Sequence, residues 1–243
     1  MGNLKEIRRR ITSVKNTKQI TRAMKLVSAA KLRRAQDAAT NGRRYAEEIR
    51  NALADLLALL PEQDRPALMR SKDSITNRRI VVVGGERGLC GPYNANIAKS
   101  IEKQLLESKG VSQELLAIGS KVVSSAKRFK WNVESKFEKL PENAAEWPIQ
   151  EMVAKLVDDF VSGKCDEVVI FYTKFITAMS QEVVKIPLLP LRCEELKSIK
   201  QSKDSISPKT DPSVKILLEG LIPLYLETQF RQSALESKAS DCN

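Results

Sequence analysis

The sequence predicts an α/β protein in which N- and C-terminal helices pair as an antiparallel coiled coil and a mostly parallel sheet domain lies between them. Three observations support this prediction. The first 60 residues contain no Pro and, between Gly2 and Gly42, no Gly, so helix-forming residues dominate them. β-branched runs then alternate with helical segments from residue 79 to residue 191. From Pro212 onward, apolar residues recur with helical spacing.

The first segment, residues 1–60, is expected to form one helix. Such a helix would be roughly 90 Å long at about 1.5 Å per residue. That is too long for an ordinary surface helix of a 243-residue chain. At about 100° per residue its apolar side chains fall on three different faces, which no single partner helix can cover. The three stripes are Leu4, Ile7, Ile11 and Val14; Ile20, Met24 and Val27; and Ile49, Leu53, Leu56, Leu57 and Leu60.

Positive charge is concentrated at the start of this helix. The first 34 residues carry eleven Lys or Arg and one acid, Glu6, which gives +10 of the formal net charge of +11. Because these cations point in every direction around the helix, they do not form the single solvated face of a helix packed on one core. We expect a helix that pairs with another helix over part of its length and meets acidic or polar partners over the rest. A helix that is merely solvated is common for charge runs, but it explains neither the length nor the one-sign bias.

The elements after the first helix follow from their patterns. A polar connector, residues 61–78, precedes the α/β domain, residues 79–191. The expected strands are 79–83, 114–118, 133–137, 167–172 and 182–186, and the expected helices are 94–108, 121–129 and 146–162. A loop or linker follows at 192–211, and then a C-terminal helix at 212–243, in which Gly220 and Pro223 predict a kink or a short break.

The two terminal helices each carry an apolar stripe that needs a partner. Pairing the end of the first with the start of the second satisfies both stripes. The second helix would span at most roughly 48 Å at about 1.5 Å per residue. It would therefore run back only to about residues 28–30 of the first helix and leave the first 27 or so unpaired.

Composition excludes several classes of site. The chain has no His, and its four cysteines, Cys90, Cys165, Cys193 and Cys242, include no C-x-x-C pair. A zinc site, a disulfide framework and a His-based catalytic triad are therefore not expected, and the thiols are interpreted as buried or incidental. No run approaches the eighteen or so apolar residues of a membrane span, and the start lacks the apolar core of a signal peptide, so we expect a chain that is neither integral nor exported.

The segment GGERGLCGPYN, residues 84–94, stands between a predicted strand and a predicted helix, where a phosphate-binding loop would lie. It lacks both the G-x-G-x-x-G of a dinucleotide site and the Gly-Lys-Ser/Thr that would meet phosphate and magnesium. We interpret Gly88, Cys90 and Gly91 as parts of a structural turn, with Cys90 a small buried residue. No catalytic residue, cofactor site or metal site is predicted.

A basic-arm nucleic-acid-binding α/β protein is the alternative function, because Lys and Arg along a helix release counterions from phosphates. Against it, no aromatic residue occurs before Tyr45 to stack on bases. A helix that lies on a membrane surface would need one apolar face with aromatic anchors, and this helix has neither.

Five segments match one family in the right order and over nearly the whole chain. They are EIRRRITSVKNTKQITRAMKLVSAAKLRRAQ (6–36), RGLCGPYN (87–94), YTKFITAMSQ (172–181), LLPL (188–191) and LIPLYLETQFRQSALESKAS (221–240). Together they resemble the gamma subunit of the rotary F-type ATP synthases. The resemblance implies a noncatalytic central rotor, whose coiled coil lies inside the catalytic hexamer and whose Rossmann-like α/β domain lies near the membrane ring, coupling proton flow to ATP synthesis.

The resemblance also implies partners and a location. The partners are the alpha and beta subunits of the catalytic head, the epsilon subunit and the membrane c-ring, with no nucleic acid. The residues expected to face the catalytic subunits are Arg8, Arg9, Arg10, Met24, Lys25 and Lys31. With no transit segment before the family's start, we expect a peripheral protein on the cytoplasmic face of a bacterial cell membrane. The sequence departs from the family at Pro92, which replaces a glycine, and in stopping at Asn243, where the family's second helix continues; Cys193 stands alone, so thiol regulation is not expected.

Overall fold

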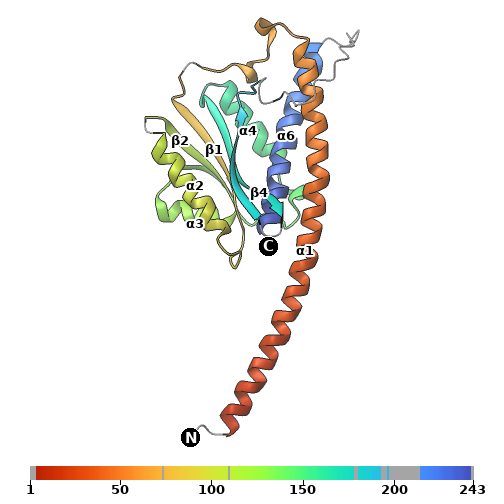
Figure 1. Ribbon diagram of the computed structural model, residues 1–243. Coiled ribbons are helices and arrows are strands. Elements are labelled where there is room, and N and C mark those ends of the chain that lie inside the picture. The colour runs from red at the N-terminus through yellow and green to blue at the C-terminus, as the bar shows by residue number, and fades with distance from the viewer. Residues whose placement is uncertain are drawn as a thin grey trace.

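The computed structural model describes residues 4–241 apart from 73, 109, 178–179, 193–195 and 197–213. Helix α1 runs without interruption from Leu4 to Ala58, over 55 residues. Figure 1 shows that its N-terminal half projects away from the rest of the molecule, whereas its C-terminal half lies against the α/β body. Residues 4–30 are all exposed, while Leu53 and Leu57 are buried. Of the three predicted apolar stripes, only the third therefore packs within this chain.

A mixed five-stranded sheet forms the centre of the body, in the order β3-β2-β1-β4-β5. The strands are β1 (Asn77–Val83), β2 (Ser112–Ile118), β3 (Val133–Phe137), β4 (Glu167–Thr177) and β5 (Ser180–Leu189). The first four run parallel and β5 pairs antiparallel with β4, which confirms the mostly parallel sheet. The chain fills the sheet outward from β1 to β3 and then returns to the other side of β1. The topological switch point thus lies between β1 and β4.

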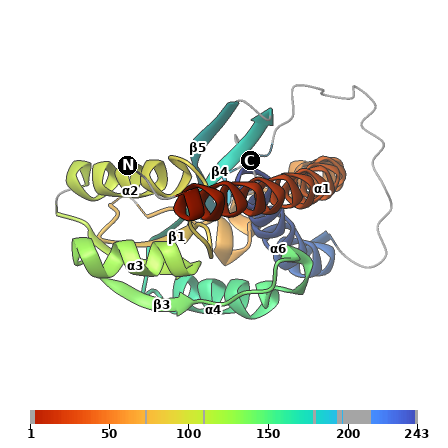
Figure 2. The ribbon, with the colours of Figure 1, turned by 90° about the horizontal axis from the view of Figure 1, so that it is seen from below.

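Helices cover both faces of the sheet. One face carries α2 (Tyr93–Glu107) and α3 (Ser120–Phe129), and the other carries α4 (Ile149–Val161), α6 (Val214–Asp241) and the end of α1. Figure 2 shows α2 and α3 on the side of the body away from α6. Alternate residues of β1 serve the two faces, because Ile80 and Val82 pack with α2 and α3 while Val81 and Val83 pack with α4 and α6. Burial on both faces explains why this strand is a continuous apolar run.

Helix α6 runs antiparallel to α1, as predicted, with its C-terminal end beside the middle of α1 (Figure 1). It continues through Gly220 and Pro223, so the predicted short break does not occur. A proline inside a helix costs roughly 3 kcal/mol, but burial of Leu218, Ile222 and Leu226 in the core holds the helix together. The predicted loop at 192–211 lies outside the described residues, apart from Arg192 and Leu196.

Asp166 ties the connector before β1 to the start of β4. Its carboxylate accepts hydrogen bonds from the backbone N–H groups of Thr76 (2.8 Å) and Asn77 (2.9 Å), from the Thr76 hydroxyl (2.7 Å) and from the Lys72 ammonium. The Lys72 ammonium and the other donors hold the pKa of Asp166 well below its usual range, in spite of its burial.

Three short 3₁₀ helices complete the described connections. They are Glu62–Asp64, Ala67–Met69 and Ala144–Glu146.

We expect Asp166→Asn to lower the free energy of unfolding at pH 7 by about 1–3 kcal/mol, because the charge that strengthens these hydrogen bonds is lost. Since the folded pKa lies below the unfolded value of about 3.9, the contribution of the carboxylate is complete above about pH 5 and is lost as the pH falls toward the folded pKa. Urea unfolding of both proteins between pH 7 and pH 2.5 would test this. A difference in stability that stays constant over this range would contradict it.

Candidate functional site

The exposed N-terminal part of α1, residues 4–30, is the strongest candidate site, and we call it the basic arm. It carries eight Lys or Arg residues and one acid, Glu6. Glu6 pairs with Arg10 at 2.9 Å, four residues along the same helix. Both side chains of this pair are mostly exposed, so the pair contributes little to stability. The basic arm therefore presents a strongly positive surface on every side.

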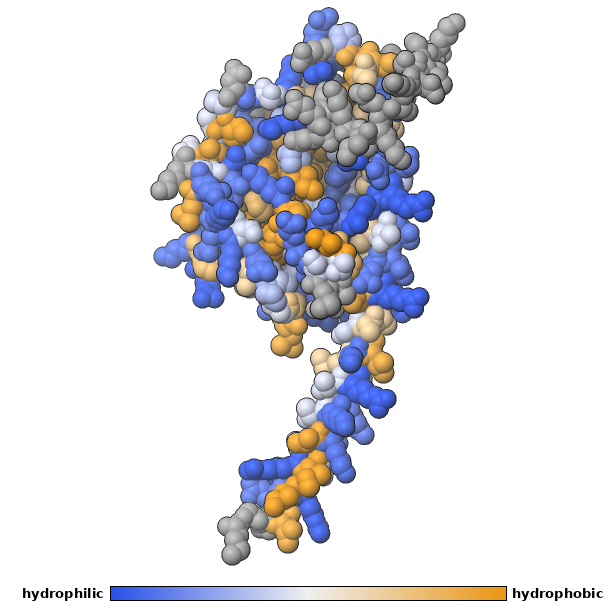
Figure 3. Space-filling model, in the orientation of Figure 1, coloured by the Kyte–Doolittle hydropathy of each residue, from blue (hydrophilic) through white to orange (hydrophobic). Residues whose placement is uncertain are grey.

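Apolar side chains are exposed on the basic arm as well. Figure 3 shows them interspersed with hydrophilic side chains along its length. Those with large exposed fractions are Leu4, Ile7, Ile11, Val14, Ile20, Met24, Leu26 and Val27. A concentration of exposed apolar groups on one projecting element is typical of a surface that a partner covers.

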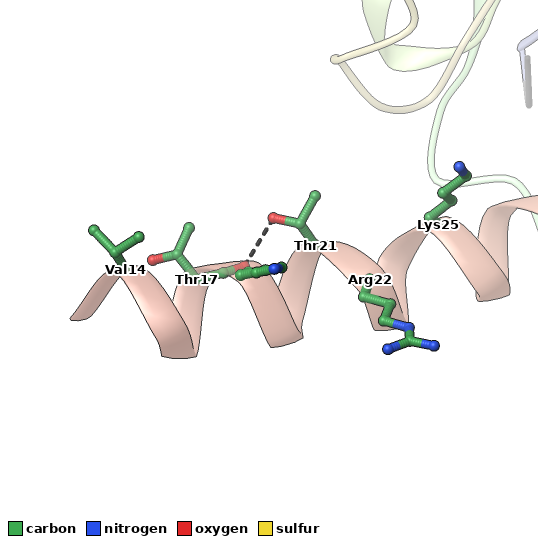
Figure 4. A pocket seen from close by; sticks show the side chains of 6 residues that line it. Val14, Thr17, Thr21, Arg22 and Lys25 are labelled. Atoms are coloured by element: carbon green, nitrogen blue, oxygen red, sulfur yellow. Dashed lines mark hydrogen bonds between the residues drawn. The ribbon is translucent and has the colours of Figure 1, made fainter. Parts of the chain in front are cut away.

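The basic arm is a convex surface, not a binding pocket. A shallow hollow along it is lined by six residues of one helix, Val14, Thr17, Lys18, Thr21, Arg22 and Lys25 (Figure 4). Within it the Thr21 hydroxyl donates to the backbone carbonyl of Thr17 at 2.8 Å, so this polar group is satisfied inside the helix. A surface of this shape suits contact with surrounding protein better than the enclosure of a small ligand.

Five of the six residues predicted to face partners lie on the basic arm. They are Arg8, Arg9, Arg10, Met24 and Lys25, and all are exposed. Lys31 is placed differently, because its ammonium lies 2.7 Å from a carboxylate oxygen of Glu142 in the loop before α4. The hydrogen bond from Lys31 lowers the pKa of Glu142. Lys31 thus marks the point where α1 leaves the α/β body.

The loop between β1 and α2 is a tight turn. Gly91 has φ +55°, a conformation that favours glycine, whereas a Cβ at Gly88 would only touch the flexible Lys121 side chain. Cys90 is half-buried, so the prediction that it is buried is wrong. The Asn94 side-chain amide, at the start of α2, donates to its sulfur at 2.9 Å and holds the thiol at the rim of the turn. Burial and the nearby charge of Asp241 raise the pKa of Cys90, which argues against an activated nucleophile.

Helix α6 fills the crevice at the switch point of the sheet, where ligands bind in folds of this topology. The Ser237 hydroxyl donates to the carbonyl of Val83 at the end of β1 (3.4 Å), and the Ser240 hydroxyl donates to the carbonyl of Thr173 in β4 (3.2 Å). A Cβ at Gly85 would lie 2.7 Å from the Asp241 carboxylate, so glycine permits this close approach. The chain's own helix occupies the space that a nucleotide would need.

The N-terminus of α3, a second place where an anion could bind, holds the carboxylate of Glu86. Glu86 accepts hydrogen bonds from the backbone N–H (3.2 Å) and hydroxyl (2.5 Å) of Ser120 and from the backbone N–H groups of Lys139 and Leu140 (3.2 Å each). Burial alone would raise the pKa of Glu86, but these hydrogen bonds outweigh it and the pKa is lowered. A carboxylate of the chain itself thus takes the position that a phosphate would take at a helix N-terminus.

We expect the isolated chain to show no specific affinity for Mg-ATP and no ATPase activity. The turn lacks the lysine and hydroxyl of a phosphate site, the crevice is filled by α6, and the anion position at α3 is held by Glu86. Calorimetric titration of the purified chain with Mg-ATP would test this. A micromolar dissociation constant would contradict it.

The sequence did not mark Glu86, Glu142 or Asp241 as important. Glu86 could have been singled out, since it lies inside the glycine-containing turn. Glu142 could not, because its partner Lys31 is 111 residues away in the chain. Over the described ranges, no cluster of His, Cys, Asp and Glu could hold a metal ion, and no helix is long and apolar enough to cross a membrane.

Comparisons with known proteins agree on one family. Residues 3–243 match the family model described as ATP synthase. The ATP synthase gamma chain of Heliobacterium modesticaldum is 35% identical over 99% of this chain and 83% of its own length, and that of Ralstonia nicotianae is 34% identical over 99% and 84%. A chain from the central stalk and c-ring structure of the Tetrahymena thermophila mitochondrial ATP synthase has a TM-score of 0.64 at 20% identity, covering 92% of this chain and 94% of its own. That structural likeness supports the fold of a long helix pair beside an α/β domain.

Proposed function

This chain belongs to the ATP synthase gamma-chain family, and we propose that it acts as the central rotor, coupling proton flow through the membrane ring to ATP synthesis in the alpha and beta catalytic hexamer. It is a noncatalytic subunit, so its work is mechanical: its rotation changes which catalytic site is open. Its partners are the alpha and beta subunits, the epsilon subunit and the c-ring. The comparisons give no support to nucleic-acid binding.

The observation that carries this proposal is the basic arm, a single exposed helix that projects from a folded body (Figure 1). A rotor that turns inside a ring meets each surrounding subunit in turn, and so it needs a contact surface on every side. Cations around the whole helix fit acidic partner loops in any rotational position. A helix that docked on one fixed partner would need only one such face.

Arg8, Arg9, Arg10, Met24 and Lys25 are the residues we assign to contact with the catalytic subunits. All five lie on the exposed basic arm. Lys31 belongs to the same set, and its ammonium also pairs with Glu142. We therefore assign it to the edge of the hexamer that lies nearest the α/β body.

The division of the chain follows the same plan. We assign residues 1–60 and 212–243 to the two coiled-coil segments, 61–78 to the connector and 79–191 to the Rossmann-like domain, and most of the predicted linker, 192–211, lies outside the described residues. As part of the membrane-associated complex, the protein is peripheral. We place it on the cytoplasmic face of a bacterial cell membrane, which the bacterial origin of the similar gamma chains supports.

Reconstitution with purified alpha and beta subunits is the experiment that tests this function. We expect a stoichiometric complex with ATPase activity that neither the chain alone nor the separate subunits show. An alternative outcome is tight binding to DNA or RNA at physiological salt with no such complex. That result would replace the rotor by the nucleic-acid-binding alternative.

We expect Met24→Lys to impair coupling more than folding. Met24 is 57% exposed on the basic arm. A cation added at this position changes the interaction of the basic arm with the acidic loops of the partner subunits that pass it. The free energy of unfolding should change by less than about 1 kcal/mol, as for most exposed substitutions. The measurement is the ratio of proton-driven ATP synthesis to ATP hydrolysis in vesicles that hold the complete ATP synthase, with its membrane ring.

Met24→Gln is the matched control for this variant, because it removes the thioether without adding charge. We expect it to couple far better than Met24→Lys. If Met24→Lys assembled and coupled as well as the parent protein, the assignment of Met24 to the surface facing the hexamer would be wrong.

A further inference from the structure

A polar layer crosses the interface between α1 and α6. It consists of Gln232 and Glu236 on α6, which are buried, and of Arg43 on α1, whose side chain is 50% exposed, and it lies beside Gly42 of α1. One oxygen of Glu236, whose side chain is only 3% exposed, accepts hydrogen bonds from the Arg43 guanidinium at 2.8 and 3.1 Å and from the Gln232 amide at 2.8 Å. The Gln232 amide also donates to the backbone carbonyl of Ala39 on α1 at 3.0 Å. The polar layer therefore joins both helices through directional contacts.

Two acceptors of this layer have no donor. The second carboxylate oxygen of Glu236 and the side-chain oxygen of Gln232 are buried and have no hydrogen-bond donor within the part of the chain that is described. Buried acceptors without donors are destabilising. Selection of one helix register is a role that such a polar layer can have beside its contribution to stability.

Small residues surround the polar layer. Ala39 and Ala46 on α1 and Ala234 and Ala239 on α6 are all buried. Alanines allow two helices to approach closely, but their short side chains interlock weakly and fit several axial registers. Polar residues at a helix interface are the best-attested means of selecting one register.

Two further contacts fix the position of the layer. A Cβ at Gly42 would lie 2.4 Å from the side-chain oxygen of Gln232 and 3.0 Å from a methyl carbon of Leu235, so both side chains would have to shift if α1 had a larger residue here. The Arg43 guanidinium also donates to the backbone carbonyl of Phe175 at 3.3 Å, which connects the layer to β4. The helix pair is thereby aligned with the sheet.

We propose that Glu236 is a positioning residue that sets the axial register of α6 on α1 through Arg43 and Gln232. Because α6 is packed on the sheet and α1 continues into the basic arm, this register fixes how far the basic arm extends from the α/β body. The register of α6 on α1 is a property of the free chain. The effect of this register on coupling rests on the proposed rotor function.

Distance measurement between spin labels on the two helices tests the register. The four natural cysteines are replaced, and nitroxide labels are attached through Glu48→Cys on α1 and Glu219→Cys on α6, which are exposed positions. The parent chain should give one narrow distance. The double variant Arg43→Met/Glu236→Leu leaves no buried charge unpaired, so it should melt at or above the parent's temperature but show a second distance, displaced by about one helical turn, or roughly 5 Å.

The control makes the same kinds of substitution at an exposed pair, Lys103→Met/Glu107→Leu on α2. It should leave the single distance unchanged. Glu236→Gln, made in the otherwise unchanged chain, keeps the shape and the acceptor and should retain the single distance. A folded Arg43→Met/Glu236→Leu variant that keeps the single parental distance would overturn the proposal.

If that double variant does not fold, Arg43→Lys tests the proposal instead. This substitution keeps the positive charge but loses one of the two hydrogen bonds that the guanidinium donates to Glu236. A broadened distance distribution would support the proposal, and an unchanged one would overturn it. In vesicles that hold the complete ATP synthase, with the membrane ring, we expect the register-shifted variant to assemble but to synthesise ATP several-fold more slowly than the parent. Failure of the parent chain to assemble would count against the rotor function and would leave the distances in the free chain as they are.

Discussion

Phe230→Ala should lower the free energy of unfolding by about 3–5 kcal/mol, the range for truncation of a fully buried aromatic residue. Phe230 is 0% exposed and belongs to the core cluster that joins α6 to α1, α4 and the sheet. Because the sheet and α1 hold this site on several sides, the structure cannot collapse into the cavity that the substitution leaves. The helix that fills the switch point of the sheet would lose its main apolar anchor.

Equilibrium unfolding in urea, with the slope compared between the variants, would measure this loss. Leu224→Ala is the matched control, since Leu224 lies on the same helix but is 39% exposed, and its loss should be about 1 kcal/mol or less. Equal effects of the two substitutions would show that α6 is not anchored through Phe230.

The sequence predicted the fold well where local pattern and tertiary packing agree. The absence of Pro and the scarcity of Gly predicted the continuity of α1, and the β-branched run at residues 79–83 predicted the central strand. Of the kink or short break predicted at Gly220 and Pro223, the break does not occur. There, burial of Ile222 and Leu226 on either side outweighs the local cost, and no short-range pattern reports that burial.

The candidate site was predictable for a different reason. Charge on the basic arm is a property of the local sequence, so its one-sign bias is visible without the fold. The pairing of Lys31 with Glu142 and of Arg43 with Glu236 joins residues 111 and 193 positions apart, and only the packing of the body creates them. The contacts that orient the basic arm could therefore not be predicted from the sequence, whereas the basic arm itself could.

The contacts with the α/β body stabilise only the second half of α1, so the two halves of this helix differ in stability. From Lys31 onward, α1 gains contacts from Glu142, then from the polar layer, and finally from the core around Leu53. Before Lys31, all described residues of α1, 4–30, are exposed. A structure that is rigid at one end and unsupported at the other suits an axle that is completed by the partners around it.

Hydrogen exchange on the free chain should show this boundary directly. An isolated helix without tertiary packing is marginal in water, so amides of residues 5–25 should exchange with protection factors below roughly 100. Amides of residues 39–57, which pack on α6 and the core, should be protected by on the order of 10⁴ or more, near the level set by global unfolding. The second half of α1 serves as the internal control, because both halves belong to one helix.

In the reconstituted complex, protection of residues 5–25 should rise, since the catalytic subunits then cover the exposed apolar side chains of the basic arm. Strong protection of residues 5–25 in the free chain would contradict this prediction. It would mean that the chain itself stabilises the basic arm and that the arm does not need partner subunits to become ordered.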